Sequence, residues 1–391
     1  MAKTVVILGG SYAGLHVAHY LLKQKIPDIK VILVSKSSHF YWNMASVRAI
    51  VPGQIPDEQL FQPLTAALER YPEQTYELII GTAEKVDTSA KTVQVSPSSP
   101  LPDDGSAAAP STPAPPRTTL TYDHLVIATG SRSTTSSVPW KVLDTYDETL
   151  ASLDATRERV QAARHIVVAG AGATGVEVAG ELGFEYGAGD DEKEVHLLSA
   201  GPTLLDGDSV GPAARAELEK LRVRVRVGAR VAGARGLPDG RTEVALEGGE
   251  VIVTDLYLPT MGLRANSEML DQKFLGEKGY VNVDEYYRVK GVEGGEGVWA
   301  LGDVVSSPRA GFLYTQKQAA GVGKNIELAL HGKQPQKVKL MPIDVLACAV
   351  GRSRGAGRMG PVKMLSLMVW LAKGKTLGIQ RMPGYIDGSV A

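Results

Sequence analysis

At 391 residues the chain is long for a single hydrophobic core, so we expect two or three domains. Hydrophobic residues make up 43% and charged residues 22%, as in ordinary soluble globular proteins. The net charge of -1 gives no general attraction to nucleic acid, and we expect no nucleic-acid partner. The single cysteine, Cys348, excludes an intramolecular disulfide and a redox-active cysteine pair. We expect it to be a buried core thiol in an intracellular, cytoplasmic protein.

The N-terminal residues predict a strand, a glycine-rich turn, a helix and a second strand. An apolar run, Lys3–Leu8, precedes the turn Gly9–Gly14, and a helical apolar pattern leads to the next run at 30–34. Such a turn lets the backbone approach a pyrophosphate, and the helix N-terminus supplies N–H donors. Ser11 replaces the middle glycine of the usual pattern, but its hydroxyl can still donate to a phosphate.

A second copy of this unit lies in the middle of the chain. The predicted strand 165–169 precedes a complete glycine fingerprint at Gly170, Gly172 and Gly175, and another strand follows at 195–198. Two copies predict two nucleotide-binding domains. Ser199 stands where an acidic residue would repel a 2′-phosphate, so the choice between NADH and NADPH stays open.

Two more strand ends carry turn motifs. The stretch 121–132 ends a strand in Ala128-Thr129-Gly130, and Val298–Leu301 is followed by Gly302-Asp303. A carboxylate at such a turn can accept hydrogen bonds from ribityl hydroxyls. Between them, residues 96–117 are rich in Pro, Ser and Ala, which predicts a loosely ordered loop at the tip of an antiparallel hairpin.

The C-terminal tail is basic. From Lys333 onward we count ten Lys and Arg against two acids, 10 − 2 = +8, so the rest carries 32 − 41 = −9. Two interpretations stay open: an anionic partner or membrane surface, or a basic face docked on an acidic body. The tail predicts a Gly/Arg-rich loop at 351–360 and an apolar helix at 362–373. Its longest charge-free apolar run, 364–372, is too short to span a bilayer.

In this order, the motifs resemble the pyridine nucleotide-disulfide oxidoreductase superfamily, and most closely its apoptosis-inducing-factor-like group, which includes ferroptosis suppressor protein. The resemblance covers nearly the whole chain apart from 96–117. It implies an α/β fold with two Rossmann-like dinucleotide-binding domains, for FAD and NAD(P)H, and a C-terminal α+β segment. The motifs that carry it are Gly9–Ala18, Phe40–Asn43 with Arg48, Tyr122–Gly130, Gly170–Glu181, Pro259–Ser267, Val298–Asp303, Val350–Gly360 and Leu367–Leu377.

The resemblance also implies domain boundaries. Residues 1–143 would form the first part of the FAD-binding domain, and 144–258 the NAD(P)H-binding domain. Residues 259–332 would complete the FAD-binding domain, and 333–391 would cover the flavin.

The same resemblance assigns site residues. FAD would contact Gly9, Gly10, Ser11, Ala13, Gly14, Ser35, Lys36, Arg48, Thr129, Gly130 and Asp303. NAD(P)H would contact Gly170, Gly172, Ala173, Thr174, Gly175 and Glu177, with Ser199 and Gly262 beside them. Lys317, Gln318 and Ala319 would pack at the flavin ring, and Lys373 would lie near the flavin and the acceptor. Glu177, Lys317 and Lys373 are thus the catalytic candidates, and no metal is expected.

For four of these residues an ordinary structural role stays open beside the functional one. Arg48 and Glu177 fit a solvated or helix-surface charge as well as a cofactor contact. Lys317 fits a plain helix face. Lys373 fits a lysine whose stem lies along apolar surface while its charge reaches water.

The function implied is an FAD-dependent NAD(P)H oxidoreductase that passes electrons to a quinone-type acceptor, with peripheral contact to an anionic membrane. Independently of the resemblance, the chain has no cysteine pair to receive the electrons, so we expect an external acceptor. An alternative is a flavin-dependent oxidase or tailoring enzyme acting on a small metabolite. A third is an apoptosis- or DNA-associated signalling flavoprotein, supported only by the basic tail and by Arg222, Arg224 and Arg226. The sequence carries no signal for the oligomeric state.

Overall fold

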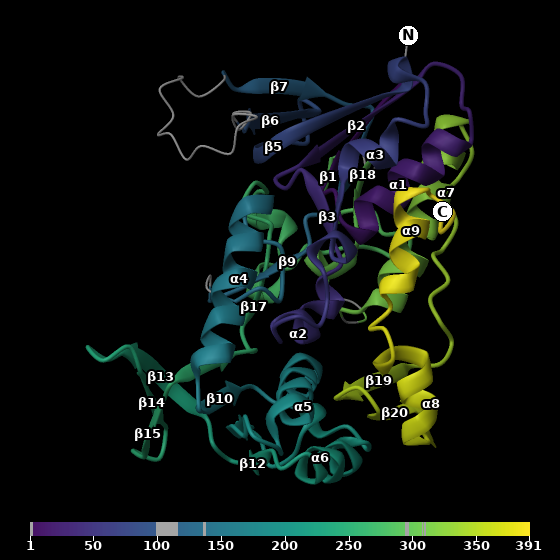
Figure 1. The fold of residues 1–391 in the computed structure, drawn as a ribbon. Helices are drawn as coiled ribbons and strands as arrows, with labels where there is room; N and C mark the ends of the chain where they lie inside the picture. The colour runs from purple at the N-terminus through teal and green to yellow at the C-terminus, as the bar shows by residue number, and fades with distance from the viewer. Residues whose placement is uncertain (1–2, 99–115, 136–137, 294–296, 307, 309) are drawn as a thin grey trace.

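The computed structural model describes residues 3–98, 116–135, 138–293, 297–306, 308 and 310–391. Two α/β bodies lie one above the other in Figure 1, and the C-terminal segment runs alongside both. None of the helices among the described residues is long and apolar enough to cross a membrane.

The upper body is built on a seven-stranded sheet in the order β18-β8-β1-β2-β5-β6-β7. Strands β18, β8, β1, β2 and β5 are parallel, whereas β5, β6 and β7 pair antiparallel. Because β18 pairs with β8, residues near 300 return to the sheet that the N-terminus begins. The bounds are β1 Lys3–Leu8, β2 Ile29–Ser35, β5 Tyr76–Asp87, β6 Thr92–Pro97, β7 Thr118–Thr121, β8 His124–Ile127 and β18 Val298–Ala300.

Helices α1 (Tyr12–Lys23) and α7 (Phe312–Leu330) pack against each other beside this sheet, as Figure 1 shows. They approach closely because Gly323 of α7 lies under the Tyr20 ring, where an added Cβ would come within 2.9 Å of it. The expected hairpin around the 96–117 insert is confirmed at its base, since β6 pairs antiparallel with β7. Most of the insert itself, 99–115, lies outside the described residues.

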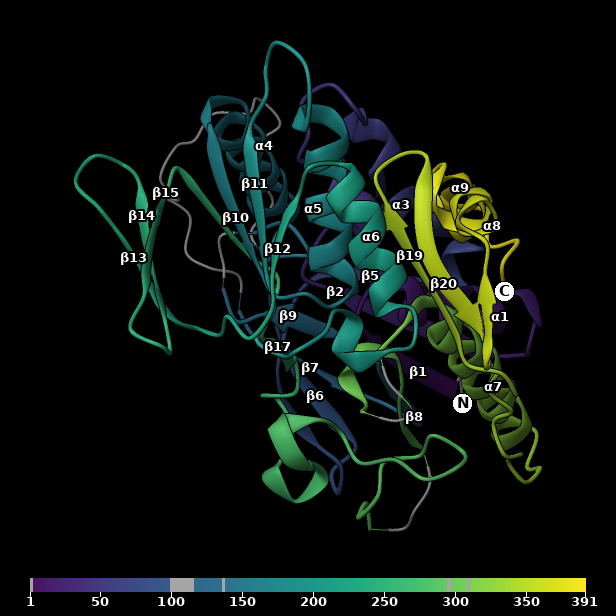
Figure 2. The ribbon, with the colours of Figure 1, turned by 90° about the horizontal axis from the view of Figure 1, so that it is seen from below.

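The lower body holds a four-stranded parallel sheet, β12-β11-β10-β16. Helices α5 (Ala173–Tyr186) and α6 (Gly211–Lys220) pack against it, and a separate antiparallel sheet, β13-β14-β15, projects to one side (Figure 2). The strand bounds are β10 His165–Ala169, β11 Glu194–Leu198, β12 Arg224–Arg226, β13 Val231–Gly236, β14 Thr242–Leu246, β15 Val251–Thr254 and β16 Leu256–Pro259.

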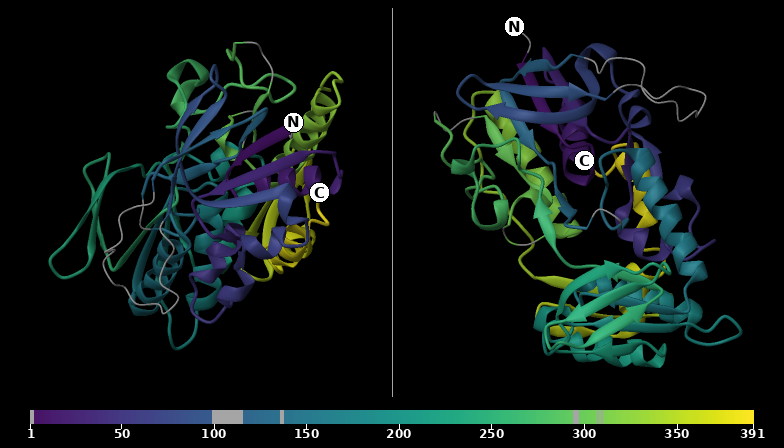
Figure 3. Two further views of the ribbon diagram at one scale, coloured as in Figure 1. Left: turned by 90° about the horizontal axis from the view of Figure 1, so that it is seen from above. Right: turned by 90° about the vertical axis from the view of Figure 1, so that its left-hand side faces the viewer.

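The chain passes between the two bodies in two connections. The first contains strand β9 (Ser131–Ser133) and leads into helix α4 (Tyr146–Ala162), which runs between the bodies along one side (Figure 3, right). The second contains strand β17 (Leu263–Ala265), which pairs antiparallel with β9. Helix α4 begins at a capping box in which Thr145 and Glu148 satisfy each other's backbone N–H groups. The two Rossmann-like units are thus confirmed, while the exact domain boundaries stay a prediction. Short elements complete the upper body: β3 His39–Tyr41, α2 Ser46–Ala49, β4 Phe61–Pro63 and α3 Leu64–Leu68.

The C-terminal segment is an antiparallel sheet followed by short helical turns. It comprises β19 (Val345–Val350), β20 (Arg354–Met359), β21 (Val362–Met364), α8 (Ser366–Val369), a π-helical turn Trp370–Gly374 and α9 (Met382–Ile386). Two predictions were therefore wrong: most of the predicted loop 351–360 is a strand, and the helix begins only at Ser366. The glycines at 355 and 357 let β20 lie under Val369, where a Cβ on either would come within 2.8 Å of that side chain.

The basic tail docks on acidic residues of the body. Arg352 pairs with Glu181 and Glu185, Arg354 with Glu217, Arg358 with Asp208, Lys373 with Glu177 and Lys337 with Glu285. Five of the ten basic residues counted in the sequence thus form ion pairs with acidic residues of the body. Arg222, Arg224 and Arg226 likewise pair with Glu192, Glu194 and Glu250, so they form no free basic face.

Candidate active site

A cavity of 1880 Å³ runs between the two bodies, larger than the roughly 300–1,000 Å³ of ordinary ligand pockets. Its walls come from both glycine-rich turns, from the strand ends near Thr129 and Asp303, and from the C-terminal segment. The predicted site residues that line it are Gly9, Gly10, Ser11, Ala13, Ser35, Lys36, Thr129, Gly130, Asp303, Gly172, Ala173, Thr174, Glu177 and Lys373.

The first glycine-rich turn needs its glycines for steric reasons. Gly9 has φ +115°, and a Cβ on Gly14 would lie 1.9 Å from the Gly9 carbonyl oxygen. Ser11 caps α1 in an extended conformation without a side-chain capping hydrogen bond, so its hydroxyl remains available to a ligand. A bare turn that opens on a large cavity at a helix N-terminus fits a dinucleotide pyrophosphate.

Two strand ends complete this half of the cavity. Thr129 donates its hydroxyl to the Asn266 carbonyl at 2.6 Å, and Asn266 donates back to the Thr129 carbonyl at 2.9 Å, which joins the two crossing connections. Next to them, Ser131 lines the cavity with a buried hydroxyl that has no hydrogen-bond partner among the described residues. A buried, unpaired hydroxyl of this kind favours a polar ligand in the cavity.

Asp303 provides a further polar group in the part of the cavity beside the first glycine-rich turn. Its Oδ2 lies 2.6 Å from Nζ of Lys141, and both side chains line the cavity while about a fifth exposed. Gln318 accepts a hydrogen bond from the Gly302 N–H at 2.8 Å and so holds the turn behind Asp303. Lys141 was not found from the sequence, because a single lysine in the linker after the Ala-Thr-Gly turn carries no motif. Its cationic head would suit the flavin phosphates.

The second glycine-rich turn repeats the geometry of the first. Gly170 has φ +103°, and a Cβ on Gly175 would lie 1.8 Å from the Gly170 carbonyl oxygen. A Cβ on Gly172 would meet only Asp206 Oδ2, at 4.0 Å, and Gly172 lines the cavity together with Ala173 and Thr174. Both turns therefore present a helix N-terminus to the same cavity, as two dinucleotides meeting face to face require.

Glu177 and Lys373 meet at the wall between the second turn and the C-terminal segment. Lys373 Nζ lies 2.5 Å from Glu177 Oε1, which also accepts the Ala349 N–H at 3.0 Å. Burial by itself lowers the pKa of Lys373, but the hydrogen bond to Glu177 and the electrostatic interactions with Glu177 and Cys348 together raise it, so the net shift is upward and the ammonium stays charged. Cys348 lies next to the pair, and burial raises the pKa of its thiol well above the ordinary value. The buried core thiol expected at this position is thus what the structure shows.

Several predicted site residues lie elsewhere. Arg48 binds Glu181 and two backbone carbonyls of the C-terminal segment, a different set of partners from the expected flavin phosphate. Lys317 is exposed on α7 because the helix turns its neighbours Gln318 and Ala319 inward, and none of the three lines the cavity. Ser199 is buried and donates its hydroxyl to the Thr203 carbonyl at 2.8 Å. Gly14, Gly170, Gly175 and Gly262 lie behind the cavity wall and shape its turns.

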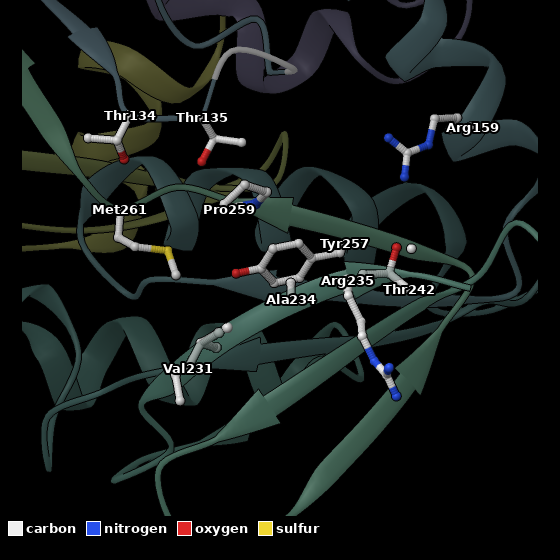
Figure 4. Close-up of a pocket in the computed structure, with 13 residues that line it drawn as sticks. Thr134, Thr135, Arg159, Val231, Ala234, Arg235, Thr242, Tyr257, Pro259 and Met261 are labelled. Carbon is white, nitrogen blue, oxygen red and sulfur yellow. The ribbon is translucent and has the colours of Figure 1, made fainter. Parts of the chain in front are cut away.

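A smaller cavity of 470 Å³ adjoins the large one, with which it shares Thr134 and Met261. In Figure 4 the Tyr257 ring lies between the threonines above it and Val231 of β13 below it. No sequence motif indicated this cavity, because its walls come from segments about 100 residues apart: β13, and the connection that contains Thr134 and Thr135.

The comparisons with known proteins agree with this geometry. The family model described as pyridine nucleotide-disulphide oxidoreductase matches residues 3–332. Oxidoreductase ptaL of Pestalotiopsis fici is 40% identical over 394 residues, covering 99% of this chain and 100% of the relative. Ferroptosis suppressor protein 1 of Homo sapiens is 26% identical over 398 residues, covering 96% and 94%.

Among solved structures, the sulfide:quinone oxidoreductase from Aquifex aeolicus matches with a TM-score of 0.74 at 16% identity, over 100% of this chain and 93% of that one. A likeness at this identity shows the shared fold alone. The family match and the relatives, together with two dinucleotide turns on one cavity, give the identification. The chain belongs to the pyridine nucleotide-disulphide oxidoreductase family, in its apoptosis-inducing-factor-like group, and is an oxidoreductase that uses FAD and NAD(P)H.

Proposed function

We propose that the protein oxidises NAD(P)H at the second glycine-rich turn and passes the electrons, through FAD bound at the first turn, to a quinone-type acceptor. The observation that carries this proposal is that one cavity is lined by both turns and by Lys373. FAD held at the first turn would supply the redox chemistry, which is hydride acceptance and two-electron transfer. In sum, NAD(P)H, a proton and a quinone become NAD(P)⁺ and a quinol.

The chain's own residues would hold and polarise the reactants. The α1 and α5 N-termini would bind the pyrophosphates, and Asp303 with Lys141 would orient the ribityl–phosphate part of FAD. Lys373 keeps its positive charge beside the cavity and would stabilise negative charge that develops on a quinone oxygen. With Cys348 as the only cysteine, no disulfide relay is available.

The acceptor wall of the cavity is apolar and continues onto the surface. Val345, Leu346, Met359, Met364 and Ala372 line the cavity from the C-terminal segment. Beside them, large apolar side chains stand in solvent, with Leu365 exposed by 73%. The others are Val362, Leu367, Met368 and Leu371. An exposed apolar cluster at a cavity mouth fits uptake of an apolar quinone from a lipid surface, which supports a peripheral membrane location.

Anaerobic stopped-flow absorbance tests the reaction. NADH or NADPH should bleach the flavin, and menadione or a short-chain ubiquinone should restore its absorbance faster than oxygen does. Lys373→Met should slow reoxidation by roughly 100-fold, the usual size of a lost charge-stabilising donor, and leave bleaching unchanged. Failure of both nicotinamides to bleach the flavin overturns the proposal. Reoxidation by oxygen as fast as by quinone would favour the oxidase or tailoring alternative.

Liposome flotation tests the surface. The double variant Leu365→Glu/Leu371→Glu should lose binding to vesicles that bind the unchanged protein, while menadione turnover in solution stays the same. Lys333→Glu is a matched control, because it changes a tail charge outside the apolar cluster. Equal binding by all three proteins would exclude this surface as the docking site.

A further inference from the structure

Arg48 is buried at the junction of three parts of the chain. It belongs to α2 in the upper body, and its side chain is only 8% exposed. All three guanidinium nitrogens are engaged: Nε and Nη2 donate to Glu181 Oε1 at 3.0 and 2.8 Å, Nη2 also donates to the Gly374 carbonyl at 2.6 Å, and Nη1 donates to the Lys375 carbonyl at 3.0 Å. One side chain thus connects the upper body, helix α5 and the C-terminal segment.

The two carbonyls that Arg48 binds directly follow Lys373. They end the π-helical turn Trp370–Gly374, in which the Lys375 N–H donates to the Trp370 carbonyl at 2.8 Å. The last carbonyls of any helical turn lack partners within the turn, and arginine is one of the side chains that can supply them. Arg48 therefore anchors the end of the π-helical turn, directly after Lys373, which lines the cavity.

Glu181 fixes the plane of that guanidinium. Its side chain is 1% exposed, and its second oxygen accepts a hydrogen bond from Arg352 Nε at 3.3 Å. Lysine could not replace Arg48 here, since an ammonium is a point charge without a planar set of donors. The geometry requires a planar guanidinium group, which can bind one carboxylate and two carbonyls at the same time.

Trp42 supplies a second anchor from the same part of the chain. Its Nε1 donates to the Leu377 carbonyl at 2.9 Å, and a Cβ on Gly378 would come within 3.1 Å of the indole ring. Trp42 and Arg48 therefore hold the residues on the C-terminal side of Lys373, while Glu177 holds its ammonium.

We propose that Arg48 is a positioning residue for electron transfer to the acceptor: by binding the carbonyls of Gly374 and Lys375 it holds Lys373 at the cavity wall. This inference rests on the proposed function only for the role of Lys373. The placement itself concerns the π-helical turn and does not depend on the acceptor.

Kinetics test the consequence. In Arg48→Lys, reoxidation of the reduced flavin by menadione should slow roughly tenfold, about the effect of losing hydrogen bonds to a charged donor. Flavin content and the rate of bleaching by nicotinamide should not change. Arg352→Lys is the matched control, because Arg352 shares Glu181 but binds neither carbonyl. An equal slowing in both variants, or none in Arg48→Lys, overturns the proposal.

A double-variant cycle with Lys373→Met separates positioning from general loosening. If Arg48 acts through Lys373, the effect of Arg48→Lys on reoxidation disappears once Lys373 is methionine. Effects that multiply in the double variant overturn the proposal.

Hydrogen exchange gives a readout that needs no acceptor. The amides of Lys375 and Leu377 are bonded to Trp370 and Lys373, so a peptide covering 370–378 reports on the turn. Its exchange should speed up in Arg48→Lys and in Trp42→Phe, but not in Arg352→Lys. Unchanged exchange in Arg48→Lys overturns the placement. If quinones fail to reoxidise the unchanged protein while exchange responds as expected, the proposed function fails and the placement stands.

Discussion

The two glycine-rich turns of this molecule share the same steric features. In each, the first glycine has a positive φ, +115° at Gly9 and +103° at Gly170. In each, a Cβ added to the last glycine would clash with the carbonyl oxygen of the first glycine, at a distance of 1.9 Å for Gly14 and 1.8 Å for Gly175. Helix N-termini that open on the same cavity follow both turns.

The helices that follow differ in what they bury. Two and six residues after the last glycine, α1 carries His16 and Tyr20, whereas α5 carries Glu177 and Glu181. On α1, burial lowers the pKa of His16, and the Tyr20 ring packs on Gly323 of α7. The α5 carboxylates instead bind Lys373, Arg48 and Arg352. The turn decides the class of ligand. The residues at these two positions decide whether the helix presents uncharged rings or carboxylates that pair with basic side chains.

The largest expected effect comes from the glycines that the two turns share. Gly14→Ala should yield protein without flavin. Gly175→Ala should keep the flavin but slow its bleaching by NADH or NADPH at least roughly 100-fold, since an ångström of misplacement has that effect. Gly233→Ala is the control, because nothing lies within 4 Å of its added Cβ. Flavin loss in Gly175→Ala would show that the turns are not separate sites.

Lowering the pH should reduce the free energy of unfolding through His16 of α1. Burial, with a smaller contribution from Lys23, lowers the pKa of His16 to about 4. The unfolded chain therefore binds more protons than the folded one, and stability falls as pH drops from about 6.5 to 4. The loss through His16 amounts to about 3 kcal/mol at pH 4.

Urea unfolding between pH 7 and pH 4.5 measures this loss. In His16→Leu, the free energy of unfolding should fall less steeply with decreasing pH. Leucine would leave no group unpaired at Nδ1, because this atom has no hydrogen-bond partner among the described residues. An unchanged slope in His16→Leu would assign the acid sensitivity to other groups.

Removing one charge on the α5 side should cost about 2–3 kcal/mol of unfolding free energy in Glu177→Ala. This lies below the 3–5 kcal/mol of fully buried pairs, because a quarter of the Lys373 side chain is exposed. Adding Lys373→Met should recover part of the loss, as no unpaired charge remains. Arg215→Ala, which breaks an exposed pair with Glu219, should change stability by less than about 0.5 kcal/mol. No recovery in the double variant would contradict this account of the pair.

The smallest effect concerns Tyr20, the α1 counterpart of Glu181. Its hydroxyl donates to Glu327 Oε2 at 2.7 Å, but Lys324 also binds that oxygen at 3.0 Å. Tyr20→Phe should therefore cost only about 1 kcal/mol, measured by urea unfolding at pH 7. A loss as large as that of Glu177→Ala would mean that the two helix positions carry similar energy after all.

Local signals were enough to predict both turns, because glycine patterns after apolar strands describe backbone geometry that is complete within a few residues. With the residues that the family resemblance added, fourteen predicted residues line the cavity, while most of its wall was not predicted. Lys317 is exposed and does not line the cavity, and the helix period of α7 could have indicated this, since Thr315, Gln318, Ala319 and Val322 lie on the buried face. Lys141 gave no signal, because its partner Asp303 lies 162 positions away.

The sequence by itself determined the class of ligand, the pair of Rossmann-like units and the lack of a disulfide relay. Each depends on a local steric requirement or on a residue count. Only the tertiary structure decided the partners of the charged side chains. Arg48 binds Glu181 and the Gly374 carbonyl across 133 and 326 positions, because a long side chain pairs with whatever the folded chain brings within reach. That is why the position of Arg48 in the chain did not reveal the carboxylate and the two carbonyls that its side chain binds.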